Sequence, residues 1–125
     1  MKKVINTEKA PAAIGPYSQG IMFGDLLFLS GQLGIDPATG EFPSDDVEEQ
    51  CEQVFRNIQA LLTEAGLAFS DVIKCTVFLA DMADFAKVNA IYAKYFQAPY
   101  PARSAFAVAQ LPKAAKVEIE VIAGK

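Results

Sequence analysis

The most regular pattern of hydrophobic and polar positions lies between Asp45 and Ala65, where apolar residues recur at steps of three and four. That spacing places them on one stripe of an amphipathic helix. Asp45 with Glu48 fits a capping box at the start of this helix, and Gly66 fits the left-handed position that often follows a helix end. We therefore predict a helix over residues 45–65.

A second helix is predicted from Asp81 to about Phe96, with Asp81 and Asp84 in its first turn and two prolines beyond its end. Its apolar side is formed by Phe85, Val88, Tyr92, Tyr95 and Phe96. Asn89 falls on the same side, and a carboxamide buried without partners costs about 1 to 3 kcal/mol. We therefore expect the Asn89 amide to have a hydrogen-bond partner.

Shorter apolar segments predict the strands. Residues 2–6 alternate weakly and fit a short edge strand, and residues 20–24 and 26–30 fit a hairpin that turns at glycine and aspartate. Leu26–Leu29 is apolar at four consecutive positions, so we expect both faces of that strand to be covered. The next strand covers residues 72–79, and one of its faces carries Ile73, Cys75, Val77 and Leu79.

The chain ends with two more strands in the stretch Tyr100–Ala123, which we predict to form a hairpin around a proline-containing turn. In the second strand Val117, Ile119 and Val121 alternate with Lys116, Glu118 and Glu120. In the first strand Arg103 shares its parity with three alanines, and Phe106 shares that of Ser104. The hairpin would then have a bulky apolar face and an alanine-lined face that carries the arginine and the glutamates, suited to close approach by a subunit or a ligand.

This order of elements predicts one α+β domain over residues 1–125, with a mostly antiparallel sheet and two helices on one face. At 125 residues the chain is the size of one domain, since a separate core normally needs on the order of 100 residues. Two helices cover only one face of a sheet. Because apolar residues occupy both strand parities, we expect the other face to pack against a partner.

The chain contains no histidine, which excludes histidine-dependent triads, His-rich zinc sites and histidine general bases. Acid and base chemistry must fall to Glu, Asp, Tyr, Lys or water. The formal net charge is -4 and no Lys/Arg cluster is present, which argues against nucleic-acid binding, because phosphate contacts need a basic face.

Cysteine usage and the N-terminal sequence favour the cytoplasm as the expected compartment. Cys51 and Cys75 lie far apart inside apolar segments, which fits two reduced core thiols better than a disulfide or a metal site. Val4 and Ile5 are followed at once by polar residues, so the apolar region of a signal peptide is missing. No apolar run approaches the length of a membrane span.

Several short motifs, in order along nearly the whole chain, resemble those of the RidA (YjgF) family of reactive enamine/imine intermediate deaminases. The matching segments are Ala10–Gly20, Ser30–Gln32, Phe85–Asn89, Pro101–Ser104, Gln110–Pro112 and Val117–Glu120. The resemblance implies a chorismate-mutase-like fold and a homotrimer with its sites at subunit interfaces. It implies no metal and no organic cofactor.

The resemblance gives Arg103 and Glu118 the central roles. From pattern alone Arg103 could be a surface arginine at an interface, but the matching arginine of the family grips the substrate carboxylate, for which a guanidinium is a planar match. Glu118 could be a solvated carboxylate. If its face is buried in a trimer, desolvation would raise its pKa and it could hold and deprotonate the attacking water.

Five further positions are placed around the same cleft by the resemblance alone. Tyr17 would act as a lid, Ser30 and Gly31 as a floor, and Asn89 as an orienting amide. Ala105 would offer its backbone N–H to the carboxylate. Many relatives carry cysteine at the position of Ala105, so thiol-dependent chemistry is not expected here.

The function implied is hydrolytic deamination of short 2-imino acids, namely 2-iminobutanoate and 2-iminopropanoate, to 2-keto acids and ammonia. Such an enzyme is a hydrolase acting on a C=N bond, and the family clears reactive intermediates released by pyridoxal-phosphate dehydratases. An alternative is a non-catalytic regulatory module that binds 2-keto acids through the same arginine. Ribonuclease or translation-inhibitor activity is a third possibility, which the acidic charge disfavours.

Overall fold

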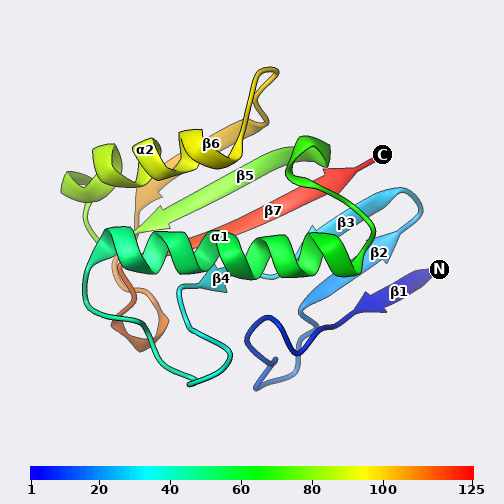
Figure 1. Ribbon diagram of the computed structural model, residues 1–125, viewed down its shortest axis with the longest axis horizontal. Helices are drawn as coiled ribbons and strands as arrows, with labels where there is room; N and C mark the ends of the chain where they lie inside the picture. The colour runs from blue at the N-terminus through cyan, green and yellow to red at the C-terminus, as the bar shows by residue number, and fades with distance from the viewer.

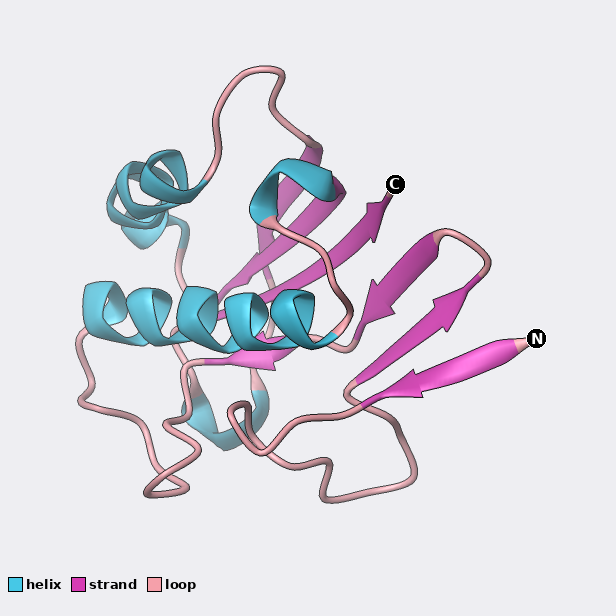
Figure 2. Cartoon of the chain, turned by 45° about the vertical axis from the view of Figure 1, so that its right-hand side comes forward, coloured by secondary structure: helices cyan, strands magenta, loops and turns pink.

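A seven-stranded sheet carries two α-helices on one of its faces (Figures 1 and 2). The computed structural model describes all 125 residues. The strands are β1 Lys2–Ile5, β2 Gly20–Phe23, β3 Leu26–Leu29, β4 Gln32–Leu33, β5 Val72–Leu79, β6 Ala102–Ala107 and β7 Val117–Gly124. The helices are α1 Val47–Glu64 and α2 Phe85–Tyr95, with short 3-10 turns at Phe69–Asp71, Met82–Asp84 and Pro112–Ala114. The predicted α+β class with two helices on one face is confirmed, and neither helix has the length and apolar character needed to cross a membrane.

The order of strands across the sheet is β1-β2-β3-β7-β5-β6, and β4 pairs with β7 beside this path. All pairs are antiparallel except β5 with β6. The prediction of a terminal hairpin was therefore wrong, because β5 lies between β6 and β7. Helix α2 connects β5 to β6 as a crossover, and such a connection makes its two strands parallel neighbours. The other edge of β5 is then free to take β7.

In strand β5 a simple period of two does not predict correctly which residues are buried. Its pairing with β7 shifts register between Val72 and Lys74. Val72 therefore takes the buried position, and Ile73 is turned outward with an exposed fraction of 49%. The other members of the predicted face, Cys75, Val77 and Leu79, are buried as expected.

Both helix starts lie close to their predicted positions but differ in detail. The N-cap of α1 is Asp46, whose side chain accepts a hydrogen bond from the backbone N–H of Glu49 at 3.2 Å, so the capping residues are one position later than predicted. Gly66 has φ +76°, the left-handed conformation expected beyond α1. Asp81 accepts from the N–H of Ala83 and begins a 3-10 turn that leads into α2.

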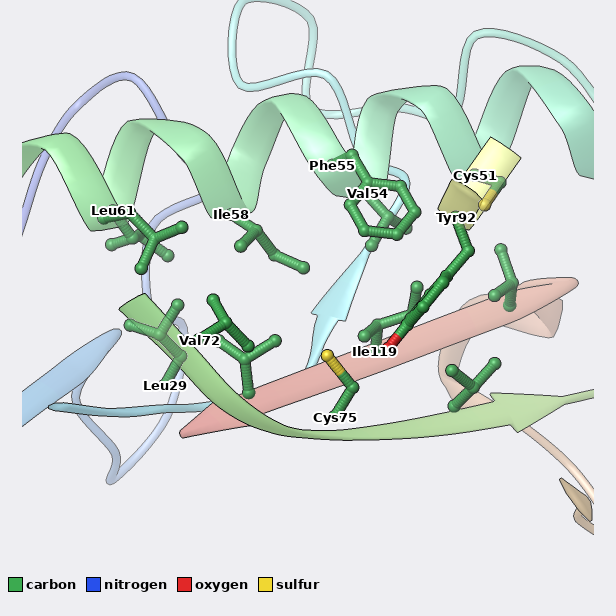
Figure 3. Packing of buried hydrophobic residues seen from close by; sticks show 14 of the residues in the cluster. Leu29, Cys51, Val54, Phe55, Ile58, Leu61, Val72, Cys75, Tyr92 and Ile119 are labelled. Atoms are coloured by element: carbon green, nitrogen blue, oxygen red, sulfur yellow. The ribbon is translucent and has the colours of Figure 1, made fainter. Parts of the chain in front are cut away.

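The core lies between the helices and the sheet (Figure 3). Phe55 of α1 is fully buried at its centre, stacked on Tyr95 at 4.5 Å between ring centroids and packed edge-on against Tyr92 at 6.1 Å. Burying one such side chain contributes roughly 1.5 to 3 kcal/mol. Cys51 and Cys75 are free and buried, as predicted, and burial raises their pKa values to about 12 and about 11, so both thiols stay protonated.

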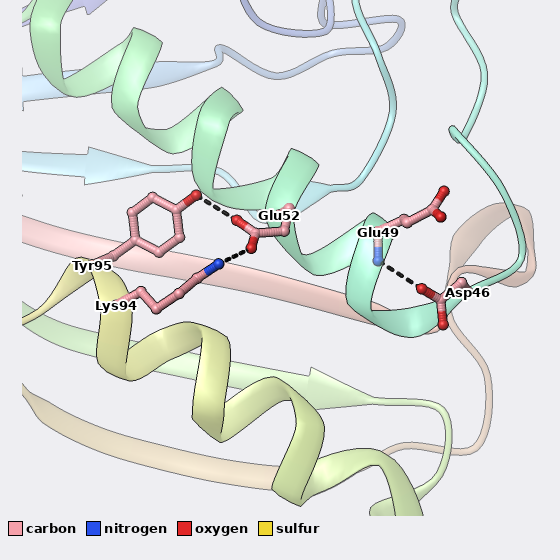
Figure 4. A network of polar contacts seen from close by, with 5 residues as sticks. All are labelled: Asp46, Glu49, Glu52, Lys94 and Tyr95. Carbon is pink, nitrogen blue, oxygen red and sulfur yellow. Dashed lines mark hydrogen bonds and ion pairs between the residues drawn. The ribbon is translucent and has the colours of Figure 1, made fainter.

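A polar contact on the outer side of the core ties the two helices together (Figure 4). Glu52 of α1 forms an ion pair with Lys94 of α2 and accepts a hydrogen bond from the Tyr95 hydroxyl at 2.6 Å. Burial opposes the charged form of Glu52, but the hydrogen bonds from Lys94 and Tyr95 outweigh it and lower the pKa of the carboxyl. The contact joins the two helices beside the core.

The sheet face away from the helices, here called the open face, is apolar and exposed in the single chain. Its large exposed side chains are Val4, Phe23, Leu26, Phe28 and Phe106. Within one chain only Leu27 and Leu29 of β3 are covered, so the expectation that both faces of this strand are buried is not met by the chain alone. The alanine-lined side of β6 was predicted on this face but lies on the helix side, where Ala105 packs against the core.

Candidate active site

Arg103 of β6 lies against α2 on the helix side of the sheet. Its Nη1 donates a hydrogen bond to Oδ1 of Asn89 at 2.7 Å. The guanidinium carbon lies 4.7 Å from the centre of the Tyr92 ring and 5.4 Å from that of Phe85. Asn89 has a hydrogen-bond partner as predicted, but it is exposed in the single chain and not buried on the apolar side of α2 as the pattern had indicated. We call Arg103, Asn89 and the neighbouring Ala105 the helix-side cluster.

No carboxylate of the chain neutralises Arg103, since the one ion pair present joins Lys94 to Glu52. The ionisable groups closest to it stay neutral. Burial and the Cys75 thiol raise the pKa of the Tyr92 hydroxyl well above its usual range, and burial likewise raises the pKa of Cys75. Nε and Nη2 of Arg103 have no acceptor in the chain. Such an arginine is suited to bind an external carboxylate through two parallel hydrogen bonds.

Glu118 is the first residue of β7 whose side chain points to the open face, where it lies against Gly31. A Cβ built on Gly31 would collide with the Oε2 atom of Glu118, so only glycine leaves room for this carboxylate in its present position. Burial, and then the negative charge of Glu120, raise the pKa of Glu118. A carboxylate with a raised pKa is a better proton acceptor than an ordinary surface glutamate. We call Gly31 and Glu118, together with Ser30 next in sequence to Gly31, the open-face cluster.

Ser30 and Tyr17 belong to segments held together by backbone hydrogen bonds. The Ser30 hydroxyl donates to the carbonyl oxygen of Ser18 at 2.6 Å, next in sequence to Tyr17. Tyr17 is half exposed, as a lid residue would be. The loop that carries it is held by Gln19, which is 2% exposed and whose Nε2 donates to the carbonyl oxygens of Thr7 and Pro11 at 3.0 and 2.8 Å.

Gln19 was not singled out from the sequence, although it lies inside the motif Ala10–Gly20. Its Oε1 also accepts from the N–H of Thr7 at 2.7 Å, so one buried amide at the end of the loop satisfies backbone groups near its start. The sequence feature that could have identified Gln19 is its position directly before an apolar strand. A polar side chain buried there must find hydrogen-bond partners. Phe85 and Tyr92 were predicted only as apolar residues of α2.

The two clusters lie on opposite faces of the sheet. Arg103 pairs with Cys75 on the helix side, whereas Glu118 pairs with Phe78 on the open face. They are two strands and three residues apart, which corresponds to about 14 Å in the plane of the sheet. The prediction that Arg103 and Glu118 share a face was therefore wrong, because it relied on the terminal hairpin. One chain alone cannot bring both side chains to one small acid.

Two grooves of the single chain contain neither cluster. One, of about 490 Å³, lies between the two long helices and is lined by charged residues that include Glu49, Arg56 and Lys94. Another, of about 540 Å³, lies among the loops that precede α1. None of the predicted site residues lines either groove.

Comparison with known proteins agrees with the motifs. The family described as Endoribonuclease L-PSP matches residues 7–125. Reactive Intermediate Deaminase A, chloroplastic, from Arabidopsis thaliana is 58% identical over 98% of this chain and 65% of its own length. A Bos taurus protein named 2-iminobutanoate/2-iminopropanoate deaminase is 50% identical over 98% of this chain and 90% of its own length.

Solved structures give the same result at the level of the fold. The crystal structure of Escherichia coli TdcF with bound serine has a TM-score of 0.94 at 48% identity, with 98% of each chain covered. Another, from Yersinia pestis and described as a conserved Rid family protein of unknown function, has a TM-score of 0.97 at 48% identity over the full length of both chains. On its motifs, its sequence relatives and its fold, this chain belongs to the RidA/YjgF family.

Proposed function

We propose that this chain hydrolyses 2-iminobutanoate and 2-iminopropanoate to the corresponding 2-keto acids and ammonia. Relatives named as reactive intermediate and 2-iminobutanoate/2-iminopropanoate deaminases support imine or enamine deamination in general. The observation that carries the proposal is the unneutralised guanidinium of Arg103, which is held at Nη1 by Asn89 and keeps two donors free for a carboxylate. A short 2-imino acid has such a carboxylate next to its C=N carbon.

We further propose a homotrimer whose sites lie between subunits. Arg103 and Glu118 face opposite sides of the sheet, so a contact between copies that joins the helix-side cluster of one to the open-face cluster of the next would complete a site. Such a contact uses two different patches, and a contact of this kind forms a ring when its rotation closes. The apolar side chains of the open face support burial against another copy. The number three comes from the family resemblance.

In the proposed reaction Arg103 binds the substrate carboxylate and places the C=N carbon beside Glu118 of a neighbouring copy. Water held by Glu118 attacks that carbon, and its proton passes to the carboxylate as the C–O bond forms and the C=N π electrons move to nitrogen. The protonated Glu118 returns this proton to the amine nitrogen. The remaining hydroxyl proton then passes through Glu118 to the nitrogen as the C–N bond breaks, so that neutral ammonia leaves and the keto group forms.

The roles of the remaining residues follow from their positions. Gly31 lies against Glu118 and, with the adjacent Ser30, would form the floor, Tyr17 would cover the substrate, and the Ala105 backbone would add a donor next to Arg103. Imines also hydrolyse unaided in water, so positioning the substrate and one water is enough to accelerate the reaction. The proposed chemistry accordingly needs neither a metal nor an organic cofactor.

A coupled assay tests this function. A dehydratase generates the imine, and the appearance of 2-keto acid is timed with and without the protein. Faster keto-acid formation that is lost in Glu118→Gln supports the proposal, whereas an unchanged rate with the intact protein contradicts it. A module that only binds 2-keto acids would have no use for a half-buried carboxylate of raised pKa at position 118. A ribonuclease role is disfavoured by the net charge of -4.

A further inference from the structure

Three residues of α2 contact one guanidinium. Phe85, Asn89 and Tyr92 are spaced at i, i+4 and i+7, which places them on one stripe of the helix. Asn89 accepts a hydrogen bond from Nη1 of Arg103, and the two aromatic rings lie within 4.7 and 5.4 Å of its Cζ atom. An arginine at the exposed edge strand β6 is thereby held on several sides, although its side chain remains open to solvent.

Tyr92 contributes its ring and not its hydroxyl. The residue is 5% exposed, and its hydroxyl is buried without a hydrogen-bond partner, pointing toward the sheet near Cys75 (Figure 3). The ring is fixed from behind by Phe96, at 4.6 Å, and by Phe55. The hydroxyl lies against the Cys75 thiol, while the ring face toward Arg103 is available for a cation–π contact.

We propose that Phe85 and Tyr92 are positioning residues that orient the Arg103 guanidinium for its ligand. Asn89 holds the Nη1 end of the same guanidinium. The stripe occupies Nη1 and the guanidinium face, which leaves the edge formed by Nε and Nη2 for a planar carboxylate. A guanidinium that is already held in position loses less side-chain freedom when the ligand binds. This inference rests on the proposed carboxylate site, and its test separates the two.

Nuclear magnetic resonance can observe the contact directly, because the chain has only two arginines, Arg56 and Arg103. The Nε–H resonance of Arg103 should be displaced by the ring currents of Phe85 and Tyr92 and should show restricted motion. In Tyr92→Leu we expect this resonance to move toward that of a mobile arginine, while Tyr92→Phe restores it. Arg56, which donates to Gln53, is the internal reference.

Binding of 2-oxobutanoate, measured by calorimetry, gives the second readout. Removing one ring should weaken binding about two- to fivefold, the range of a partly exposed cation–π contact. In the coupled assay the loss should appear in KM and not in kcat, since the contact helps binding equally before and during reaction. Tyr95→Leu is the matched control, because Tyr95 belongs to the same helix and packs on Phe55 but does not contact Arg103.

The outcomes are distinct. If the intact protein binds 2-oxobutanoate, Arg103→Ala does not, and Tyr92→Leu binds normally with an unmoved Arg103 resonance, the inference fails and the carboxylate site stands. If the intact protein does not bind 2-oxobutanoate, the proposed site fails on its own. An equal displacement in Tyr95→Leu would assign the effect to general loosening of α2 and would overturn the role of the ring. Should Tyr92→Leu not fold, the less buried Phe85→Leu decides the same question.

Discussion

The backbone of Gly31 lies directly against the carboxylate of Glu118, so that no side chain at position 31 can coexist with the observed position of Oε2. We predict that Gly31→Ala displaces the carboxylate and lowers deaminase turnover at least about tenfold, in the range typical of losing a positioned general base. The fold should persist, because the colliding atoms are mainly the end of a flexible side chain. Turnover in the coupled assay, beside thermal unfolding, checks this, and a fully active variant would show that Glu118 does not act from this position.

Substitutions at the two proposed catalytic positions should separate binding from hydrolysis. Arg103→Ala and Arg103→Lys should weaken 2-oxobutanoate binding about tenfold to a hundredfold, because a hydrogen bond to a charged group is worth about 1.5 to 3 kcal/mol and lysine lacks the fork. Glu118→Gln should bind the keto acid normally and lose most turnover, since an amide cannot accept a proton from water. Calorimetry and the coupled assay are run on the same preparations, and unchanged binding in Arg103→Ala would place the carboxylate elsewhere.

The pH dependence of activity should report the raised pKa of Glu118. Since the base acts in its ionised form, kcat/KM should fall on the acid side at a pH above the usual range of a glutamate. Glu120→Gln removes the second cause of the shift and should move this acid limb to lower pH. The profile is measured after subtracting the uncatalysed hydrolysis of the imine, and an acid limb at the same pH in both proteins would contradict the assignment.

The same pKa shift has a consequence for stability. Because the folded-state pKa of Glu118 lies above its unfolded value, the native state binds this proton more tightly, and the resulting stabilisation is present below the unfolded pKa and is lost as pH rises through the folded pKa. Glu118→Gln should therefore raise the free energy of unfolding at neutral pH relative to the natural chain, and the difference should shrink in acid. Denaturant titrations at both pH values test this.

The contact between Glu52 of α1 and Lys94 of α2 changes stability with pH in the opposite direction. The pKa of Glu52 is lowered in the folded chain, so its contribution to stability is present above the unfolded pKa and is lost as pH falls through the folded value. We expect Glu52→Gln to cost up to about 1 kcal/mol at neutral pH, as for a partly exposed ion pair, and nothing in strong acid. Added salt should reduce the effect, and a cost that does not depend on pH would contradict it.

Assembly should depend on the open face. Phe28→Asp places a charge among the apolar side chains proposed to be buried between copies, and we expect it to shift the mass from trimer to monomer in light scattering at micromolar concentration. Met82→Asp is the matched control, since Met82 is 46% exposed against 41% for Phe28 but belongs to the 3-10 turn before α2. A monomeric natural chain, or a trimeric Phe28→Asp, would contradict the proposal.

The local pattern of the sequence was sufficient for the helices and for most strands. Apolar residues at steps of three and four predicted α1 and α2 to within a few residues, because a helix buries one stripe whatever lies opposite it. Asn89 has a hydrogen-bond partner in Arg103, although the residue is exposed and the burial that motivated this prediction is not found. The motifs by themselves indicated the family.

The order of the strands was decided by tertiary structure alone. A period of two says which residues share a face of one strand, but it carries no information about which strand lies beside it. The insertion of β5 between β6 and β7 therefore could not be predicted from residues 102–124. For the same reason the sequence could not show that Arg103 and Glu118 lie on opposite faces of the sheet. Each side chain was identified from its own segment, and their placement on opposite faces follows from long-range backbone pairing, which depends on the whole sheet.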